Sequence, residues 1–395
     1  MAPIGSPMTI TAIASGTDCT ASPIAGNLKP ISPISSAISR SAAPITIIME
    51  SMRDCSGWCA RRSEMPMPSP DVSFYCCPDP ACHRAALIAE ADGLRCTNGH
   101  VFPFASGTDV PVFAEAATGG SEYSVTDAAE LHDNALRWLF KTFRTDEATL
   151  RRRLIERLDL APGQSLLVTG AGAGNDLPYL AERMRGRGTI YAQDIARPML
   201  LAGAARHQGT LRDMGIDARF SISDATQLPF ADGAFDAAYH FGGINLFPDI
   251  GAGITEMNRV VRLGGKIVIA DEGLAPWLRN AEIGKQLIAN NTLYAYAAPL
   301  EHLPETARDA KLSWELHNCF YVIEFVVGDT PLPIDIDVPH VGRRGGSIRT
   351  RYFGQLEGVD PQLKEAAYAE AERRGLSRVE FLEELLLAAT RGRTT

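Results

Sequence analysis

The sequence lacks an apolar run long enough to cross a lipid bilayer. Its strongly apolar stretches, such as Leu385–Thr390 and Ala43–Met49, are far shorter than the roughly 20 residues of a membrane-spanning helix. Met1–Ile10 also lacks the basic start and apolar core of a secretory signal. We therefore expect a cytoplasmic protein that makes no use of a membrane.

A surplus of positive charge is missing as well. The 395 residues include 38 Lys and Arg against 47 Asp and Glu, which gives a formal net charge of −9 at pH 7. Salt-driven binding to nucleic acid needs the opposite balance, because Lys and Arg displace the counterions of the phosphates. The composition therefore disfavours a nucleic-acid partner and fits a globular protein with one large domain and a smaller one.

The first 70 residues contain little that predicts regular structure. Ser, Pro, Ile and Ala dominate them, and Ser-Pro and Ala-Pro pairs interrupt helical and strand patterns alike. We expect residues 1–70 to form a disordered tail, or to precede a true start at Met65 or Met67.

Cysteine, by contrast, is concentrated in one place. Four of the eight cysteines stand between positions 76 and 96, beside a histidine at position 100. Two such ligand pairs joined by a short hairpin can close a tetrahedral zinc site. The expected ligands are Cys77, Cys82, Cys96 and His100. Cys76 could replace Cys77, His83 could compete, and a zinc-free ribbon of buried thiols is the alternative.

Beyond this ribbon the pattern changes to alternating helices and strands. Thr126–Phe143 predicts an amphipathic helix, with apolar residues at helical spacing that include Leu131 and Trp138. From Arg151 onward, helical stretches alternate with short apolar runs, which indicates a parallel sheet covered by helices. The runs are Ser165–Thr169, Thr189–Ala192, Arg219–Ser221, Ala237–Phe241 and Lys266–Ala270.

A glycine-rich turn follows the first of these runs directly. Glycines at 170, 172 and 174 separate the strand from a helical stretch, so that a ligand can approach the free N–H groups of the helix. The spacing is G-x-G-x-G and not the G-x-G-x-x-G of the dinucleotide fingerprint. The turn therefore predicts a nucleotide site of a different class.

Acidic residues after the next two runs support such a site. Asp194 stands about twenty residues past the turn, where a carboxylate can accept both hydroxyls of a ribose. Asp224 and Ala225 follow the third run, in position for the amino group and ring of adenine. The predicted cofactor-binding residues are Gly170, Ala171, Gly172, Gly174, Asp194, Ile195, Asp224, Ala225 and His240.

With these motifs, residues 125–330 resemble the class I S-adenosylmethionine (SAM)-dependent methyltransferases, in particular the menaquinone and ubiquinone C-methyltransferases. The resemblance implies SAM as methyl donor and an α/β fold, a Rossmann-like seven-stranded sheet ending in an antiparallel hairpin at Ser313–Val327. Two positions depart from the family pattern: Val168, where an acidic residue is usual, and Leu263, where Pro is usual. The first departure removes an expected contact to the amino acid end of SAM.

The segment Leu94–Phe113 resembles the zinc ribbon that precedes the methyltransferase domain of large-subunit rRNA guanine methyltransferases. That resemblance implies a ribbon that helps to hold RNA. Between Asp71 and Phe113, however, the only basic side chains are Arg84 and Arg95. We therefore expect a structural zinc ion, and SAM binding that does not depend on it, because the predicted SAM contacts all lie beyond residue 165.

The methyl acceptor is expected past the carboxyl ends of the fourth and fifth runs. His240 is the candidate catalytic base there, although a packing or hydrogen-bonding role is favoured over that of a base. Asp271 and Glu272 are further candidates with the same alternative. Residues 273–311 add mostly helical sequence, which would form a lid over the acceptor, with a second packing layer or a homodimer contact as the alternatives. The aromatic residues of this insertion favour a small apolar or aromatic acceptor.

The predicted domains are a tail at 1–70, a zinc-ribbon-like domain at 71–118, a methyltransferase domain at 122–338 and an extension at 339–395 that ends in a helix. The leading hypothesis is a small-molecule methyltransferase with a structural zinc ribbon. The alternatives are an rRNA base methyltransferase guided by the ribbon, and a non-catalytic scaffold.

Overall fold

The structure is a computed structural model. It describes residues 72–115, 123, 125–330, 333–341, 346–353, 356 and 359–391. The predicted tail at 1–70 lies outside these residues. So do Gly119–Ser121, whose composition predicts a linker, and two arginines at positions 343 and 344 that could bind an anionic group of the acceptor.

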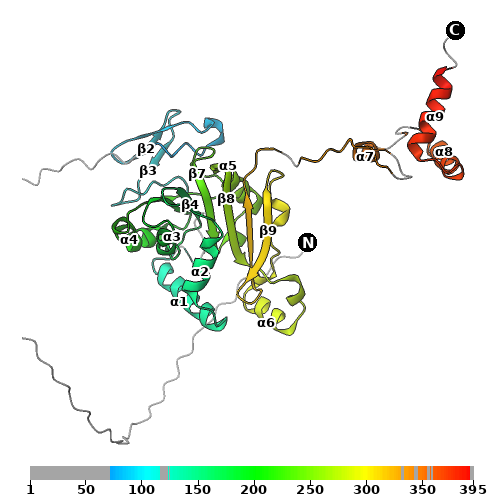
Figure 1. Ribbon diagram of the computed structural model, residues 1–395. Coiled ribbons are helices and arrows are strands. Elements are labelled where there is room, and N and C mark those ends of the chain that lie inside the picture. The colour runs from blue at the N-terminus through cyan, green and yellow to red at the C-terminus, as the bar shows by residue number, and fades with distance from the viewer. Residues whose placement is uncertain are drawn as a thin grey trace, which may run out of the picture. The chain divides into compact units, whose positions relative to one another are not determined.

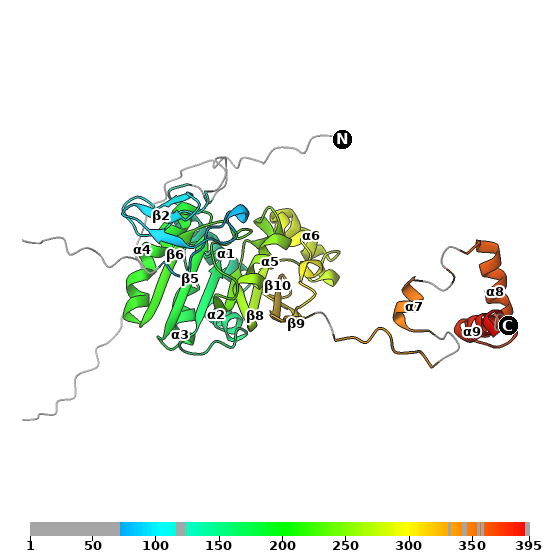
Figure 2. The same cartoon turned by 90° about the horizontal axis from the view of Figure 1, so that it is seen from above.

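A seven-stranded sheet forms the centre of the fold (Figures 1 and 2). Its strand order is β6-β5-β4-β7-β8-β10-β9, and the first five strands pair in parallel. The strands are β4(Ser165–Thr169), β5(Gly188–Asp194), β6(Ile216–Ile222), β7(Phe235–Phe241), β8(Val261–Glu272), β9(Arg308–Glu315) and β10(Phe320–Val326). Strand β10 runs antiparallel to both β8 and β9. The predicted Rossmann-like sheet with its antiparallel hairpin is confirmed.

The central strand β4 is buried on both faces, as expected of a parallel strand with a continuous apolar sequence. Leu166 and Val168 point into one core, while Leu167 points into the other. The first core contains side chains from α2(Glu147–Glu156), α3(Leu177–Arg183) and α4(Arg197–Asp213). The second contains side chains from α5(Ile250–Val260) and from residues 75–96. Helices therefore cover one face, whereas a helix and the cysteine-rich segment share the other.

Helix α1(Ala128–Thr142) occupies the segment predicted to be helical, but it buries only part of the predicted apolar face. Leu131 and Trp138, expected to be apolar contacts, are 51% and 53% exposed. Leu139, as predicted, packs partly against the first core beside Leu136, and the predicted Phe143 is buried together with Phe140. The spacing predicted the helix correctly, but the face depends on tertiary contacts.

The cysteine-rich segment, residues 72–115, is a small ribbon of three antiparallel strands. These are β1(Leu87–Ala89), β2(Gly93–Cys96) and β3(Val101–Pro103), preceded by the 3₁₀ helix η1(Pro80–Cys82). Its buried residues belong to the second core of the large sheet. The ribbon therefore packs directly on the sheet.

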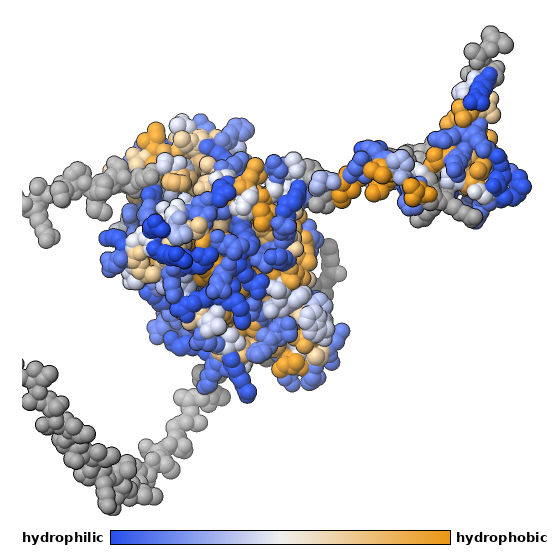
Figure 3. Space-filling view, in the orientation of Figure 1, coloured by the Kyte–Doolittle hydropathy of each residue, from blue (hydrophilic) through white to orange (hydrophobic). Residues whose placement is uncertain are grey.

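The predicted insertion at 273–311 contains α6(Glu282–Asn290) and the 3₁₀ helices η4(Pro276–Leu278), η5(Thr292–Ala295) and η6(Leu300–His302). Trp277 and Ile283 are 64% and 56% exposed, and Figure 3 shows apolar surface over this part of the molecule. Tyr294 is buried against Phe320 of β10. The insertion thus packs on the antiparallel end of the sheet.

The C-terminal segment forms three helices, α7(Ile348–Phe353), α8(Pro361–Arg373) and α9(Arg378–Arg391). Phe381 of α9 is buried, while Leu385, Leu386 and Leu387 are exposed. Among the described residues, the helices all fall short of the length and hydropathy that a bilayer crossing requires.

Candidate functional site

A cavity of about 390 Å³ opens at the carboxyl ends of the parallel strands. Residues that end or directly follow all five of these strands line it: Gly170, Asp194, Ser223, Phe241 and Glu272. Leu136 and Leu139 of α1 form part of another wall. Open α/β sheets bind ligands at this edge, so the fold and the cavity indicate the same site.

The glycine turn after β4 forms the floor of the cavity. Gly170, Gly172 and Gly174 have φ angles of +58°, +52° and +78°, which L side chains rarely adopt. A Cβ atom at Gly170 would also lie 2.8 Å from Cε1 of His240. Gly170, Ala171 and Gly172 line the cavity, whereas Gly174 is not among the lining residues and packs against His207 and Leu177.

Asp194 ends β5 beside this turn. Its Oδ2 accepts the N–H of Gly172 at 2.7 Å, and its Oδ1 accepts the N–H of Ala196 at 2.8 Å. Burial raises the pKa of Asp194, although these backbone hydrogen bonds oppose the rise. The carboxylate lines the cavity together with Ile195. It is therefore fixed in place with acceptor capacity remaining for a ligand.

Asp224 and Ala225 lie in the loop after β6 and line the same cavity. Oδ1 of Asp224 accepts hydrogen bonds from the N–H and the hydroxyl of Thr226, at 2.8 and 2.7 Å. The Ser223 N–H donates to the carbonyl of Asp194 at 3.1 Å. The loop is thereby tied to the end of β5, so the two predicted acidic residues lie at one site.

His240 lies beneath the glycine turn and is fully buried. Its Nδ1 is 3.0 Å from the hydroxyl of Thr169, and Nε2 has no hydrogen-bond partner within the described part of the chain. Burial lowers the pKa of His240, so the ring is neutral at pH 7. The ring contributes to the cavity lining, and this geometry favours the packing role over that of a catalytic base.

A buried ion pair at the cavity was not predicted from the sequence. Arg151 of α2 is 2% exposed and its Nη1 lies 2.7 Å from Oδ1 of Asp176, which precedes α3. Nε of Arg151 also contacts Glu147, and the guanidinium stacks 5.2 Å from the ring centre of Phe241. Arg151 and Asp176 both line the cavity. One Arg in a helix carries no sequence signal, so only the fold reveals this pair.

A second group of acidic residues lies where β8 ends. Asp271 is fully buried and accepts the N–H groups of Asn245 and Glu272, each at 2.8 Å. Asn245 in turn accepts the hydroxyl of Tyr321 at 3.0 Å. Glu272 lines the cavity, and burial and the adjacent Asp271 raise its pKa well above the usual range. Among the described residues, neither carboxylate forms a salt bridge.

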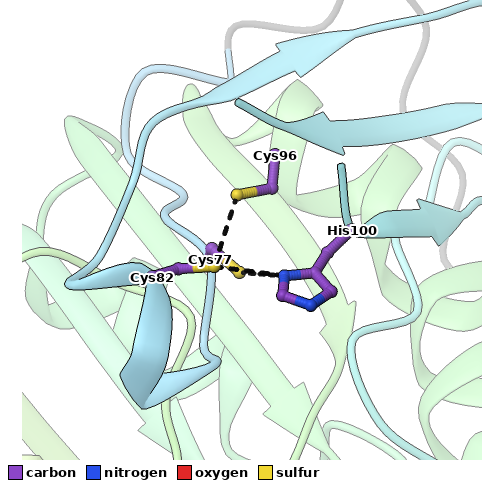
Figure 4. A group of neighbouring side chains, drawn as sticks. All are labelled: Cys77, Cys82, Cys96 and His100. Atoms are coloured by element: carbon purple, nitrogen blue, oxygen red, sulfur yellow. Dashed lines mark hydrogen bonds between the residues drawn. The ribbon is translucent and has the colours of Figure 1, made fainter. Parts of the chain in front are cut away.

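The ribbon brings together all four of the residues predicted to bind metal. The donor atoms of Cys77, Cys82, Cys96 and His100 lie within 4.8 Å of one another. His100 Nδ1 is 3.1 Å from Cys82 Sγ and 3.5 Å from Cys77 Sγ, and the Sγ atoms of Cys82 and Cys96 are 3.8 Å apart (Figure 4). Zinc–sulfur bonds of about 2.3 Å in a tetrahedron place two sulfurs about 3.8 Å apart. The cluster therefore fits a tetrahedral ion.

The surroundings of the cluster also suit a metal. Nε2 of His100 lies 3.4 Å from Oδ2 of Asp79, as when a carboxylate orients a ligating histidine. Burial raises the pKa of Cys77 to about 12. At Cys96 burial acts in the same direction, but hydrogen bonds from Asn98 and the neighbouring cluster residues lower the pKa to about 7. Cys76 and His83, the two competing candidates, lie outside the cluster.

Comparison with known proteins identifies the central part of the chain. Residues 167–269 match a family model described as a methyltransferase domain. The chain is 36% identical over 128 residues to a demethylmenaquinone methyltransferase of Beutenbergia cavernae, an alignment covering 32% of this chain and 48% of that protein. It is 27% identical over 213 residues to the methyltransferase GfsG of Streptomyces halstedii, covering 52% and 74%.

A nocamycin O-methyltransferase of Saccharothrix syringae is 34% identical over 133 residues, covering 34% of this chain and 46% of that protein. A solved structure of phosphoethanolamine N-methyltransferase 2 from Haemonchus contortus aligns with 55% of this chain and 62% of its own, at 14% identity and a TM-score of 0.42. The chain spans about half the length of the demethylmenaquinone methyltransferases that it matches.

Proposed function

We propose that this chain, which contains a class I SAM-dependent methyltransferase domain, transfers a methyl group from SAM to a small, apolar or aromatic acceptor. The observation that carries the proposal is the convergence of the glycine turn, Asp194 and Asp224 on one cavity at the carboxyl end of the sheet. The relatives named above support a small-molecule acceptor, because they include demethylmenaquinone and nocamycin methyltransferases.

The residues of the cavity fit the chemical groups of SAM in order. Asp194 would accept the ribose hydroxyls, and Asp224 the adenine amino group. The Arg151–Asp176 pair offers one positive and one negative group to the amino acid end, and Asp176 thereby substitutes for the acidic residue absent at Val168. When bound, SAM supplies an electrophilic methyl group on a sulfonium. The chain's task is then to align the acceptor and to exclude water.

The acceptor side of the cavity is largely apolar. Leu136, Leu139, Phe241, Leu293 and Phe320 line it, with Leu293 contributed by the insertion after β8. Glu272 is the carboxyl group on this wall, and its raised pKa makes it a stronger proton acceptor than an ordinary glutamate. We assign to Glu272 the removal of a proton from an acceptor hydroxyl, in place of the buried His240.

We also propose that the ribbon holds a structural zinc ion through Cys77, Cys82, Cys96 and His100. Three sulfurs and one nitrogen are a typical closed set of zinc ligands, with no position left open for catalysis. The two arginines of the ribbon are both paired, Arg84 with Asp232 and Arg95 with Glu90. Within residues 72–115 no other Arg or Lys is available for phosphates, so the ribbon does not favour an RNA acceptor.

Two measurements test the proposed function. Isothermal titration of the full chain with S-adenosylhomocysteine (SAH) should show binding, and an absence of binding at millimolar ligand would leave the scaffold alternative. Radiolabelled SAM should then transfer its methyl group to a component of a metabolite extract and not to total RNA. Labelled RNA with an unlabelled extract would contradict the small-molecule acceptor.

A further inference from the structure

The loop that contains Asp224 has no helix of its own. Residues 223–234 connect β6 to β7 through turns, although a helix usually covers the connection between parallel strands. Asp224 and Ala225 near its start line the cavity. Apart from the hydrogen bond from Ser223 to Asp194, the position of these two residues therefore depends on the segments that pack against the loop.

The ribbon holds the loop at its upstream end. The N–H of Ile222, the last residue of β6, donates to the carbonyl of Pro111 at 2.9 Å. The carbonyl of Ile222 accepts the N–H of Phe113 at 2.8 Å, and Val112 pairs in parallel with Ile222. Residues 111–113 thus extend the large sheet beside β6, two residues before Asp224.

The ribbon also holds the downstream end. The N–H of Cys76 donates to the carbonyl of Pro229 at 3.0 Å, and Tyr75 forms an antiparallel bridge with Phe230. The rings of Tyr75 and Phe230 stack with their centres 5.3 Å apart, and Phe230 is fully buried. Backbone hydrogen bonds from the ribbon therefore bracket the loop on both sides.

One contact adjoins the metal cluster directly, and the other is linked to it through the hairpin. Cys76 directly precedes the ligand Cys77. The N–H of Val112 donates to the carbonyl of Pro103, which ends the hairpin strand that follows His100. The ribbon has no core apart from the one that it shares with the sheet, so the metal would be needed to fix its hairpin and knuckle relative to each other. Loss of the ion would therefore loosen the contacts that the ribbon makes at both ends of the loop, while the hydrogen bond from Ser223 to Asp194 would remain.

Helix α5 supplies contacts that do not depend on the ribbon. The guanidinium of Arg259 donates to the carbonyls of Phe230 and Leu228, and Glu256 accepts the N–H of Leu228. These contacts hold the downstream half of the loop, whereas the upstream half, with Asp224, has no described contact to α5. Release of the ribbon should weaken the adenine subsite without unfolding the sheet.

We propose that the ribbon positions the loop 223–230 for the cofactor, so that zinc in the ribbon raises the affinity of the chain for SAM. The proposal rests on the proposed function and on the zinc site. The sequence predicted independence, because the expected SAM contacts all lie beyond residue 165. The contacts at Ile222 and Phe230 favour coupling of the two domains instead.

The first test compares the full chain loaded with zinc and stripped by a chelator. Titration with SAH should show about tenfold weaker binding without zinc, within the roughly 5- to 150-fold range of coupled sites. Hydrogen exchange in the absence of SAH should rise across residues 222–230 and stay unchanged across 165–172. Because binding free energies are linked, SAH should protect zinc from the chelator by the same factor.

Two variants distinguish the effect of the Tyr75–Phe230 contact from the effect of the metal. Tyr75→Ala removes the ring from Phe230 but keeps all four ligands, so it should retain zinc and bind SAH more weakly. Ile88→Ala, at a side chain of β1 that is 59% exposed, is the matched control and should behave as the wild type.

Equal SAH affinity with and without zinc, or unchanged exchange across 222–230, would overturn the proposal. Failure of the zinc-loaded wild type to bind SAH would refute the proposed function, while exchange without ligand would still report whether zinc orders the loop. If Tyr75→Ala fails to fold, faster hydrogen exchange across residues 165–172 will reveal it. The comparison of zinc-loaded and zinc-stripped wild type then decides whether zinc raises the affinity for SAH.

Discussion

The backbone N–H of Gly172 donates a 2.7 Å hydrogen bond to the carboxylate of Asp194, which ties the glycine turn after β4 to the end of β5. A single carboxylate therefore shapes the turn and faces the cavity. Substitution of Asp194 should therefore affect both the glycine turn and the binding of a ligand.

Asp194→Ala should weaken SAH binding at least tenfold, because a charged acceptor for the ribose hydroxyls is lost. Hydrogen bonds to charged groups contribute about 1.5 to 3 kcal/mol. Asp194→Asn should lose less, since its side-chain oxygen can still accept one of the backbone hydrogen bonds. Titration calorimetry measures both, with Asp213→Ala at the exposed end of α4 as control. A folded Asp194→Ala variant with unchanged affinity would remove Asp194 from the site.

Glu272→Gln should abolish most methyl transfer while stabilising the fold at alkaline pH. The pKa of Glu272 is raised in the folded state. Its contribution to stability is therefore fully present below the pKa of the unfolded state, and it is lost as the pH rises through the pKa of the folded state. The neutral amide should therefore raise the unfolding free energy at pH 8. At pH 4 this advantage should disappear.

Thermal unfolding at the two pH values, together with transfer of labelled methyl from SAM, measures both effects. We expect the rate to fall by about 10² to 10⁴, as for removal of a general base, with SAH affinity unchanged. Glu282→Gln, on the exposed surface of α6, serves as control. Full activity in Glu272→Gln would exclude it as the base.

The purified chain should contain about one zinc ion. Cys96→Ser and His100→Ala should lose it, whereas Cys76→Ser should keep it, because the Cys76 thiol lies outside the cluster. Elemental analysis of protein prepared without chelators provides the measurement. Zinc lost from Cys76→Ser but kept in Cys77→Ser would contradict the ligand set.

Asp79→Ala should weaken zinc binding about 10- to 100-fold, because it removes the carboxylate that lies 3.4 Å from Nε2 of His100. Asp79 also accepts the N–H of Ala81 at the start of η1, so Asp79→Asn tests the charge with less change to the turn. Competition with a chromogenic chelator gives the affinities. Equal affinity in all three proteins would show that Asp79 does not support the site.

Features encoded locally could be predicted from the sequence. The glycine turn, Asp194 at the end of β5 and the hairpin near Ser313–Val327 each depend on residues close together in the chain. The Cys/His cluster was predicted although Cys77 and Cys82 are two residues further apart than in the usual C-x-x-C pair. The 3₁₀ helix η1 turns the chain between these two cysteines, and the left-handed backbone at His83 and Arg84 follows it.

What could not be predicted depends on contacts between distant segments. His240 is buried beneath Gly170, which lies seventy positions earlier in the sequence. The local sequence around His240 would fit an exposed strand end equally well. Arg151 meets Asp176 only once α2 packs beside α3. The pairing of Phe113 with Ile222 has no local signal, because it joins segments more than one hundred positions apart.

Because the connection between β6 and β7 contains no helix, the ribbon covers this part of the sheet. This limits which truncated forms of the chain would be soluble. Tyr191, Phe230 and Phe235 form an aromatic cluster on the face of the sheet that the ribbon covers through Phe74 and Tyr75. Expression of residues 125–330 alone would expose these rings to solvent, and apolar patches of that kind promote association. A soluble minimal methyltransferase from this chain must therefore begin before Phe74 and include the cysteine-rich segment.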